Sequence, residues 1–137
     1  MPITKGCKAL LAEADAQIKT YSVSQVQAKM AAGKVQLVDI RDIRELAAGT
    51  VPGSVHAPRG MLEFWVDPDS PYYKPMWGDE SKEFILFCAA SWRSALTAKT
   101  LQDMGMINVA HMDGGWDEWL KQGGSTETLE ERKAKKS

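Results

Sequence analysis

The chain has 137 residues, of which 44% are hydrophobic and 26% charged, proportions typical of a single globular domain with a buried core. Its formal net charge of -1 gives no electrostatic reason to expect nucleic acid or an anionic membrane as a partner. No apolar run approaches the roughly 20 residues of a membrane span. Charged residues also interrupt positions 1–20 too often for a signal peptide. We therefore predict a cytoplasmic protein.

Helical and strand patterns alternate along the chain. Ser22 with Gln25 is a capping-box signature, and Gly33, Gly49 and Gly105 stand where three helical patterns stop. In chain order, the predicted elements are a helix over 3–18, a helix over 22–30, a strand over 35–40, a short helix over 42–48, a strand over 54–57, a strand over 84–87, a helix over 94–104, a strand over 108–111 and a helix over 116–122. This alternation predicts an α/β fold with a parallel sheet and helices on both faces.

Two segments differ from the rest in composition. Asp67–Trp77 contains three prolines and is predicted to be a long ordered loop. Residues 125–137 are dense in Glu, Lys and Arg, which is typical of a solvated, flexible tail. The predicted organisation is therefore an N-terminal helical extension (1–19), one domain (20–124) and a charged tail (125–137).

The most informative feature is the run from Cys88 to Ser94, in which a thiol ends an apolar strand and an arginine opens a helix. The small residues at 89–91 let the backbone curl so that successive N–H groups face the sulfur. The helix dipole and Arg93 then favour the thiolate over the thiol. A cysteine after an apolar strand is more often a buried core thiol, but the loop and the arginine together indicate nucleophilic sulfur chemistry.

The second cysteine, Cys7, lies in the N-terminal helical pattern and has no such loop, so it is predicted to be an inert structural thiol. Two cysteines are too few for a disulfide framework, and they lack the spacing of zinc ligands. A free reactive thiol at Cys88 suits a reducing compartment.

Four ordered segments resemble those of single-domain rhodaneses, a sulfurtransferase family. Cys88–Ser94 is similar to the family's Cys-x4-Arg-Ser/Thr loop. Residues 37–41 with Glu45 are similar to the family's Asp-x-Arg segment and its downstream Glu. Residues 49–54 are similar to its Gly-His-Ile-Pro-Gly-Ala segment, with Thr50 in place of His. Residues 114–119 are similar to its Gly-Gly-x-x-x-Trp segment. The resemblance covers residues 21–124 and implies the rhodanese-like three-layer fold, a central mostly parallel sheet between helices.

The resemblance implies sulfur transfer in two steps, without a metal or an organic cofactor. The Cys88 thiolate attacks the outer sulfur of a donor such as thiosulfate, and sulfite leaves a Cys88 persulfide behind. Cyanide or a cellular thiol then removes that sulfur. Loop N–H groups and Arg93 stabilise the anionic donor, the persulfide and the departing sulfite.

These arguments predict Cys88 and Arg93 as the catalytic residues. Substrate contacts are predicted for the active loop and for one further cation, namely Ala89, Ala90, Ser91, Trp92, Ser94 and Arg59. For Arg59 the alternative is a surface ion pair with Glu63, four positions on. For Trp92 the alternative to a pocket wall is simple packing.

Other polar residues are interpreted as structural. Asp39, Arg41 and Glu45 are predicted to be mainly a scaffold that fixes the first loop. His56 and His111 stand among apolar neighbours and are predicted to be structural histidines with satisfied hydrogen bonds.

Two other functions fit parts of this pattern. Related phosphatases and arsenate reductases use a Cys-x5-Arg loop, whereas only four residues separate Cys88 from Arg93, a loop too tight for phosphate. A rhodanese-like binding or regulatory module is a second alternative, as is a carrier that receives sulfur from a protein persulfide donor without turning over thiosulfate. Such modules often lack the cysteine, so Cys88 and Arg93 argue against an inactive one.

Overall fold

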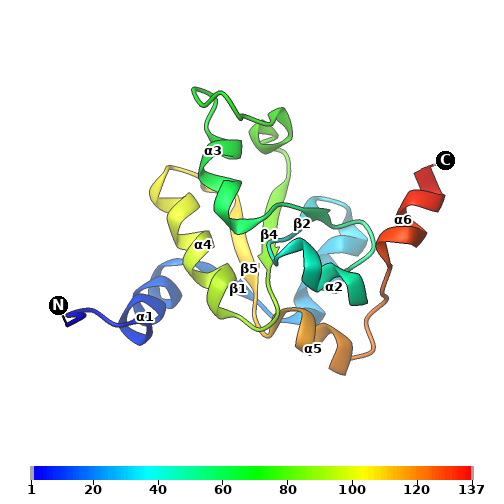
Figure 1. Ribbon diagram of the computed structural model, residues 1–137, viewed down its shortest axis with the longest axis horizontal. Helices are drawn as coiled ribbons and strands as arrows, with labels where there is room; N and C mark the ends of the chain where they lie inside the picture. The colour runs from blue at the N-terminus through cyan, green and yellow to red at the C-terminus, as the bar shows by residue number, and fades with distance from the viewer. Residues whose placement is uncertain (1, 137) are drawn as a thin grey trace.

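The structure is a computed structural model that describes residues 2–136 (Figure 1). Its centre is a five-stranded sheet in the order β1-β5-β4-β2-β3, and every neighbouring pair is parallel. The strands are β1 (Lys19–Tyr21), β2 (Val35–Asp39), β3 (Val55–His56), β4 (Glu83–Phe87) and β5 (Val109–Met112). The α-helices are α1 (Cys7–Gln17), α2 (Val23–Ala32), α3 (Leu62–Val66), α4 (Trp92–Asp103), α5 (Gly115–Lys121) and α6 (Leu129–Lys136). Three 3-10 helices are η1 (Ile43–Ala48), η2 (Arg59–Met61) and η3 (Pro75–Gly78).

Helices cover both faces of the sheet, with α1, α3 and α4 on one side and α2 and α5 on the other (Figure 1). Side chains of β4 alternate between the two faces, as a strand requires. Leu86 packs in the core cluster that includes Ala98 of α4, whereas Phe87 packs in the cluster that includes Val26 and Trp116. The predicted parallel α/β architecture with helices on both faces is therefore confirmed.

The predicted start and stop signals of α2 are present in the structure. The Ser22 hydroxyl accepts a hydrogen bond from the Gln25 N–H at 3.2 Å, and the Gln25 side chain accepts one from the Ser22 N–H at 2.8 Å. Gly33 ends the helix with φ 84°, a left-handed conformation that favours glycine. The local sequence therefore accounts for both ends of α2.

Residues beyond the predicted elements pack through tertiary contacts. Strand β1 follows α1 directly and pairs with β5, a pairing that its three-residue sequence does not reveal. Glu127, which is 4% exposed, exchanges two backbone hydrogen bonds with Thr50, and α6 follows it. Arg132 of α6 pairs with Glu127 at 3.1 Å. The division into 1–19, 20–124 and 125–137 stays a prediction.

None of the helices within residues 2–136 is long and apolar enough to cross a membrane.

Candidate active site

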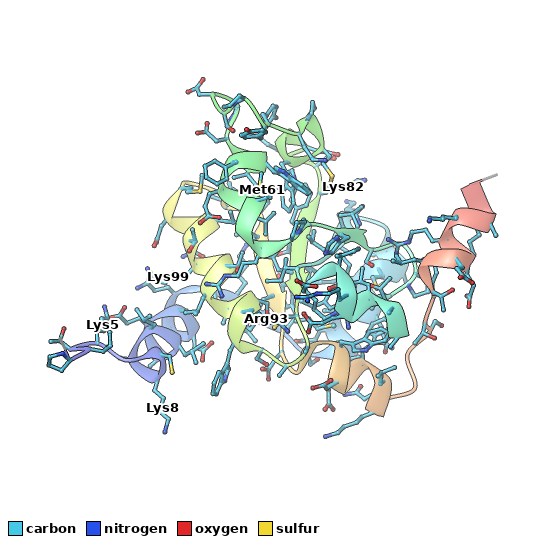
Figure 2. The ribbon with its side chains drawn as sticks, viewed as in Figure 1. Lys5, Lys8, Met61, Lys82, Arg93 and Lys99 are labelled. Atoms are coloured by element: carbon cyan, nitrogen blue, oxygen red, sulfur yellow. The ribbon has the colours of Figure 1, made fainter. Side chains whose placement is uncertain are left out.

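Cys88 stands directly after the carboxyl end of β4, the central strand, where parallel α/β sheets place their ligands. The active loop, residues 88–94, runs from this cysteine into the first turn of α4, where Arg93 lies (Figure 2). The first turn of α5 holds the start of the loop through two backbone hydrogen bonds. The Trp116 N–H donates to the Cys88 carbonyl at 2.8 Å, and the Asp117 N–H donates to the Ala89 carbonyl at 2.9 Å.

A run of backbone donors follows the cysteine. Within the described part of the chain, the N–H groups of residues 89–94 donate no hydrogen bond to a protein carbonyl or side chain. They are six consecutive donors between a buried strand and the amino end of a helix whose dipole favours negative charge. In proteins generally, such runs of backbone N–H groups bind anions.

Ser91 and Gly115 hold the active loop in shape. The Ser91 hydroxyl accepts a hydrogen bond from the Gly114 N–H at 2.8 Å and donates one to Asp113 at 2.9 Å. Gly115 has φ 54°, and a Cβ atom there would overlap the carbonyl oxygens of Cys88 and Ala90. Only glycine permits this close approach, which gives the Gly-Gly pair of the sequence a steric role.

Cys88 contacts a buried polar pair that the sequence analysis did not connect with it. Its sulfur lies 3.6 Å from the Ser94 hydroxyl, and this hydroxyl lies 2.9 Å from Nδ1 of His111. His111 Nε2 has no hydrogen-bond partner among the described residues. The prediction that both ring nitrogens of this histidine form hydrogen bonds is therefore wrong. The other histidine, His56, bonds the Arg41 carbonyl at 2.7 Å, as a structural histidine does.

The guanidinium of Arg93 is held by a carboxylate from another element. Its two terminal nitrogens donate to the two oxygens of Glu45 in η1, at 2.8 and 3.0 Å. The hydrogen bond from Arg93 holds the pKa of Glu45 at about 2, well below its usual 4.5. Glu45 in turn raises the pKa of Arg93, and interactions with Cys88 add to this rise. Glu45, predicted to be scaffold, therefore positions a residue of the active loop.

A second, buried ion pair fixes the segment that carries Glu45. Arg41 donates to both carboxylate oxygens of Asp39, with the shortest contact at 2.8 Å. It also donates to the backbone carbonyls of Gly49 at 2.8 Å and Glu45 at 3.3 Å. Thr50 donates its hydroxyl proton to Asp39 at 2.7 Å. The predicted scaffold role of Asp39 and Arg41 is confirmed by these contacts.

Not every residue predicted to contact substrate lies in this constellation. Arg59 is exposed and lines a cavity of about 220 Å³ with residues of α1 and α4, including Glu13 and Lys99, rather than of the active loop. Within residues 2–136 it forms no ion pair with Glu63 either. Trp92 is 62% exposed, so simple packing does not describe it. Substrate contacts of Arg59 and Trp92 stay predictions.

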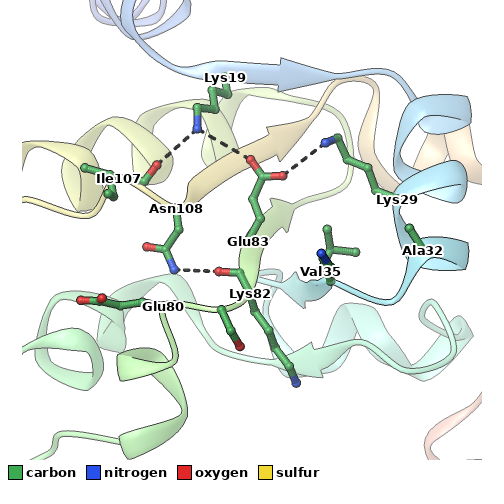
Figure 3. Close-up of a pocket in the computed structure, with 11 residues that line it drawn as sticks. Lys19, Lys29, Ala32, Val35, Glu80, Lys82, Glu83, Ile107 and Asn108 are labelled. Atoms are coloured by element: carbon green, nitrogen blue, oxygen red, sulfur yellow. Dashed lines mark hydrogen bonds and ion pairs between the residues drawn. The ribbon is translucent and has the colours of Figure 1, made fainter.

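Another cavity, of about 440 Å³, lies at the opposite end of the sheet (Figure 3). Glu83 at the start of β4 is its central anion, and Lys19 and Lys29 lie 4.0 and 3.6 Å from this carboxylate. The phenol of Tyr21 also donates to Glu83; burial, and then this hydrogen bond, raise the pKa of Tyr21 to about 12. The length of β4 separates this cavity from Cys88. No group of three or more metal-ligating side chains is found within residues 2–136.

The Glu45–Arg93 pair predicts a pH-dependent contribution to stability. Because the folded-state pKa of Glu45 is depressed to about 2, the contribution is complete above pH 4.5 and is lost as the pH falls towards 2. Both side chains are more than a third exposed, so we expect the pair to add only about 0.5 kcal/mol to the free energy of unfolding. In urea unfolding, the free energy of unfolding of wild type should exceed that of Glu45→Gln above pH 4.5, and the difference should disappear as the pH falls towards 2. Glu63→Gln, at an exposed position of α3, is the matched control, and a constant difference at every pH would contradict the prediction.

Comparison with known proteins identifies the family. The profile of the rhodanese-like domain matches residues 22–122. This span is most of the chain and contains the active loop, Glu45 and the Gly114–Gly115 turn. The chain therefore belongs to the rhodanese-like domain family.

Two curated relatives carry sulfurtransferase names, and a solved structure without an assigned function has a similar fold. Thiosulfate:glutathione sulfurtransferase of Homo sapiens is 24% identical over 108 residues, which are 75% of this chain and 94% of the human protein. YtwF of Bacillus subtilis (strain 168), provisionally named a sulfurtransferase, is 30% identical over 104 residues, 75% of this chain and 91% of that protein. A solved structure from Rhodopseudomonas palustris CGA009 is similar with a TM-score of 0.87 and 49% identity, covering 93% of this chain and 98% of that chain. It is a protein of unknown function described as a possible tyrosine phosphatase.

Proposed function

We propose that this protein is a thiosulfate sulfurtransferase, in which Cys88 carries the sulfur as a persulfide. The observation that supports the proposal best is a thiol at the end of the central strand, followed by six N–H groups that have no protein partner within residues 2–136. Arg93 adds a fixed positive charge to the same loop. Membership of the rhodanese-like family points to the same chemistry.

The reaction is two displacements at sulfur. The Cys88 thiolate attacks the outer sulfur of thiosulfate, the sulfur–sulfur bond of the donor breaks, and sulfite leaves with the electron pair. The thiolate of an acceptor, or cyanide, then attacks the outer sulfur of the persulfide, and Cys88 leaves as a thiolate. Electrons balance within each displacement, so the cycle needs no external oxidant or reductant.

The loop stabilises each anion of this cycle. Thiosulfate, the persulfide and sulfite are all negatively charged, and preorganised N–H donors cost no reorganisation when charge moves among them. Glu45 accepts one hydrogen bond from each terminal nitrogen of Arg93 and so fixes the guanidinium, which we assign to holding positive charge beside the sulfur. Lysine lacks the planar fork that binds Glu45 in two places, so it is a poor replacement.

Phosphate-ester hydrolysis is the second candidate, because a relative that is 49% identical is described as a possible tyrosine phosphatase. Against it, the loop places only four residues between Cys88 and Arg93. A tetrahedral phosphate needs the wider cradle that the longer Cys-x5-Arg loop provides. The geometry therefore favours sulfur transfer.

Intact-protein mass after brief exposure to thiosulfate tests the proposal. We expect one added sulfur atom, which cyanide removes as thiocyanate appears, and no hydrolysis of p-nitrophenyl phosphate by the same preparation. Phosphate release without added sulfur would overturn the proposal in favour of phosphatase activity. Failure to load from thiosulfate would overturn the thiosulfate assignment, and loading from a protein persulfide would then identify a sulfur carrier.

A further inference from the structure

Cys88, Ser94 and His111 form a buried chain of polar contacts that joins β4, the first turn of α4 and β5. The Ser94 hydroxyl lies between the other two, 3.6 Å from the sulfur and 2.9 Å from Nδ1 of the imidazole. None of the three residues is more than 2% exposed. We propose that His111 is a positioning residue that holds the Ser94 hydroxyl as a hydrogen-bond donor to the sulfur of Cys88.

The first step concerns the proton of His111. Burial lowers the pKa of His111 and outweighs the opposing attraction of Asp15 and Asp113, so the imidazole is neutral and carries one proton. Nε2 is buried and has no hydrogen-bond partner within residues 2–136. A proton on Nε2 would be a buried N–H without an acceptor, a rare arrangement, whereas a proton on Nδ1 is donated to Ser94. The geometry therefore favours the Nδ1–H tautomer.

The second step concerns the single proton of the Ser94 hydroxyl. If Nδ1 were an acceptor, Ser94 would donate this proton to the histidine and would have none for the sulfur. With Nδ1–H as the donor, the Ser94 proton is free, and the Ser91 carbonyl at 3.2 Å accepts it while Cys88 is a thiol. The thiol S–H then donates to the second lone pair of the Ser94 oxygen.

Ionisation of Cys88 changes this arrangement. The thiol proton goes to solvent, and the Ser94 O–H turns from the Ser91 carbonyl to the thiolate. A hydrogen bond to the charged form favours that form, so the Ser94 donor shifts the equilibrium towards the thiolate. The tautomer of His111 thus decides whether Ser94 can stabilise the nucleophile.

Other charges face the same groups and must stay constant in a test. Arg93 of α4, with Glu45 of η1 beside it, acts on Cys88, while Asp15 of α1 and Asp113 after β5 act on His111. Variants of Ser94 and His111 leave all four charges in place. The inference rests on the proposed role of Cys88 as nucleophile, but ionisation and tautomer can be measured without any sulfur transfer.

The first measurement is the pH titration of thiolate absorbance, made in a Cys7→Ser background because Cys7 is the other free thiol. We expect His111→Leu and Ser94→Ala each to raise the midpoint by about one pH unit, the size of one hydrogen bond to a charged group. The double variant should shift no further, because both changes remove the same donor. His111→Asn keeps an N–H near the position of Nδ1 and should restore most of the wild-type midpoint. An unchanged midpoint in His111→Leu, or additive shifts in the double variant, would overturn the proposal.

The second measurement needs no substitution at the site. Nitrogen-15 NMR of the His111 ring in the wild-type protein at neutral pH distinguishes the two neutral tautomers from the cation. We expect a protonated Nδ1 and a bare Nε2. Protonation at Nε2, alone or with Nδ1, would show the proposal to be wrong even if every variant failed to fold.

Discussion

Replacing Cys88 by serine is expected to abolish sulfur loading and to lower turnover by about 10³-fold or more, because a serine hydroxyl is not ionised at neutral pH and is a weak nucleophile towards sulfur. The side chain is buried against Ser94, so the change places one extra hydroxyl beside a hydrogen-bonding partner. We expect a stability cost of only about 1 kcal/mol. Intact-protein mass after thiosulfate exposure measures the loading, and thermal unfolding measures the fold.

Cys7→Ser is the matched control, because Cys7 is the other free cysteine and is exposed at the start of α1. This variant should load one sulfur atom as wild type does. If the Cys88→Ser protein still loads sulfur, and loses this loading only when Cys7 is also replaced, the persulfide forms on Cys7 and the assignment to Cys88 is refuted.

Local sequence signals predicted most of the architecture because they act within a few residues. The capping pair Ser22 and Gln25, and the alternation of strand and helix patterns, appear in the structure as expected. Strand β1 was not predicted, because its three residues alone do not specify a strand. Helix α6 was not predicted either, although Thr128 with Glu131 is a capping-box signature, and the Thr128 hydroxyl accepts a hydrogen bond from the Glu131 N–H at 3.0 Å. Three residues of β1 gain their hydrogen bonds from β5, and α6 is held through Glu127 pairing with Thr50.

In the candidate site too, the features that are local in sequence could be predicted, and the contacts made by the fold could not. The active loop could be predicted because Cys88, the small residues and Arg93 are contiguous. The partner of Arg93 could not, because Glu45 lies 48 positions away and meets it only through the fold. His111 was read as structural, although it lies three residues before the Gly114–Gly115 turn on a strand that pairs with β4. The position of His111 on the strand next to β4 is the signal from which its place near Cys88 could have been inferred.

The buried Asp39–Arg41 pair carries the largest expected effect on stability. Side-chain exposure is 0% for Asp39 and 3% for Arg41, so Arg41→Met would leave a carboxylate buried without its counter-charge. Removing one partner of such a pair typically costs about 3–5 kcal/mol. Two backbone carbonyls, that of Glu45 within η1 and that of Gly49 at its carboxyl end, also lose their donors, which loosens the segment that presents Glu45 to Arg93. We therefore expect a fall in unfolding free energy together with slower persulfide formation.

Arg44→Met separates the burial effect from the loss of a charge. Arg44 pairs with Asp42 in the same stretch of chain, but its side chain is 88% exposed, so its removal should lower the unfolding free energy far less than removal of Arg41. Urea unfolding compares the two variants directly, and Asp39→Asn added to Arg41→Met should recover part of the loss by removing the stranded charge. Equal costs for Arg41→Met and Arg44→Met would mean that the Asp39–Arg41 pair does not hold η1, and that the position of Glu45 depends on its own bond to Arg93.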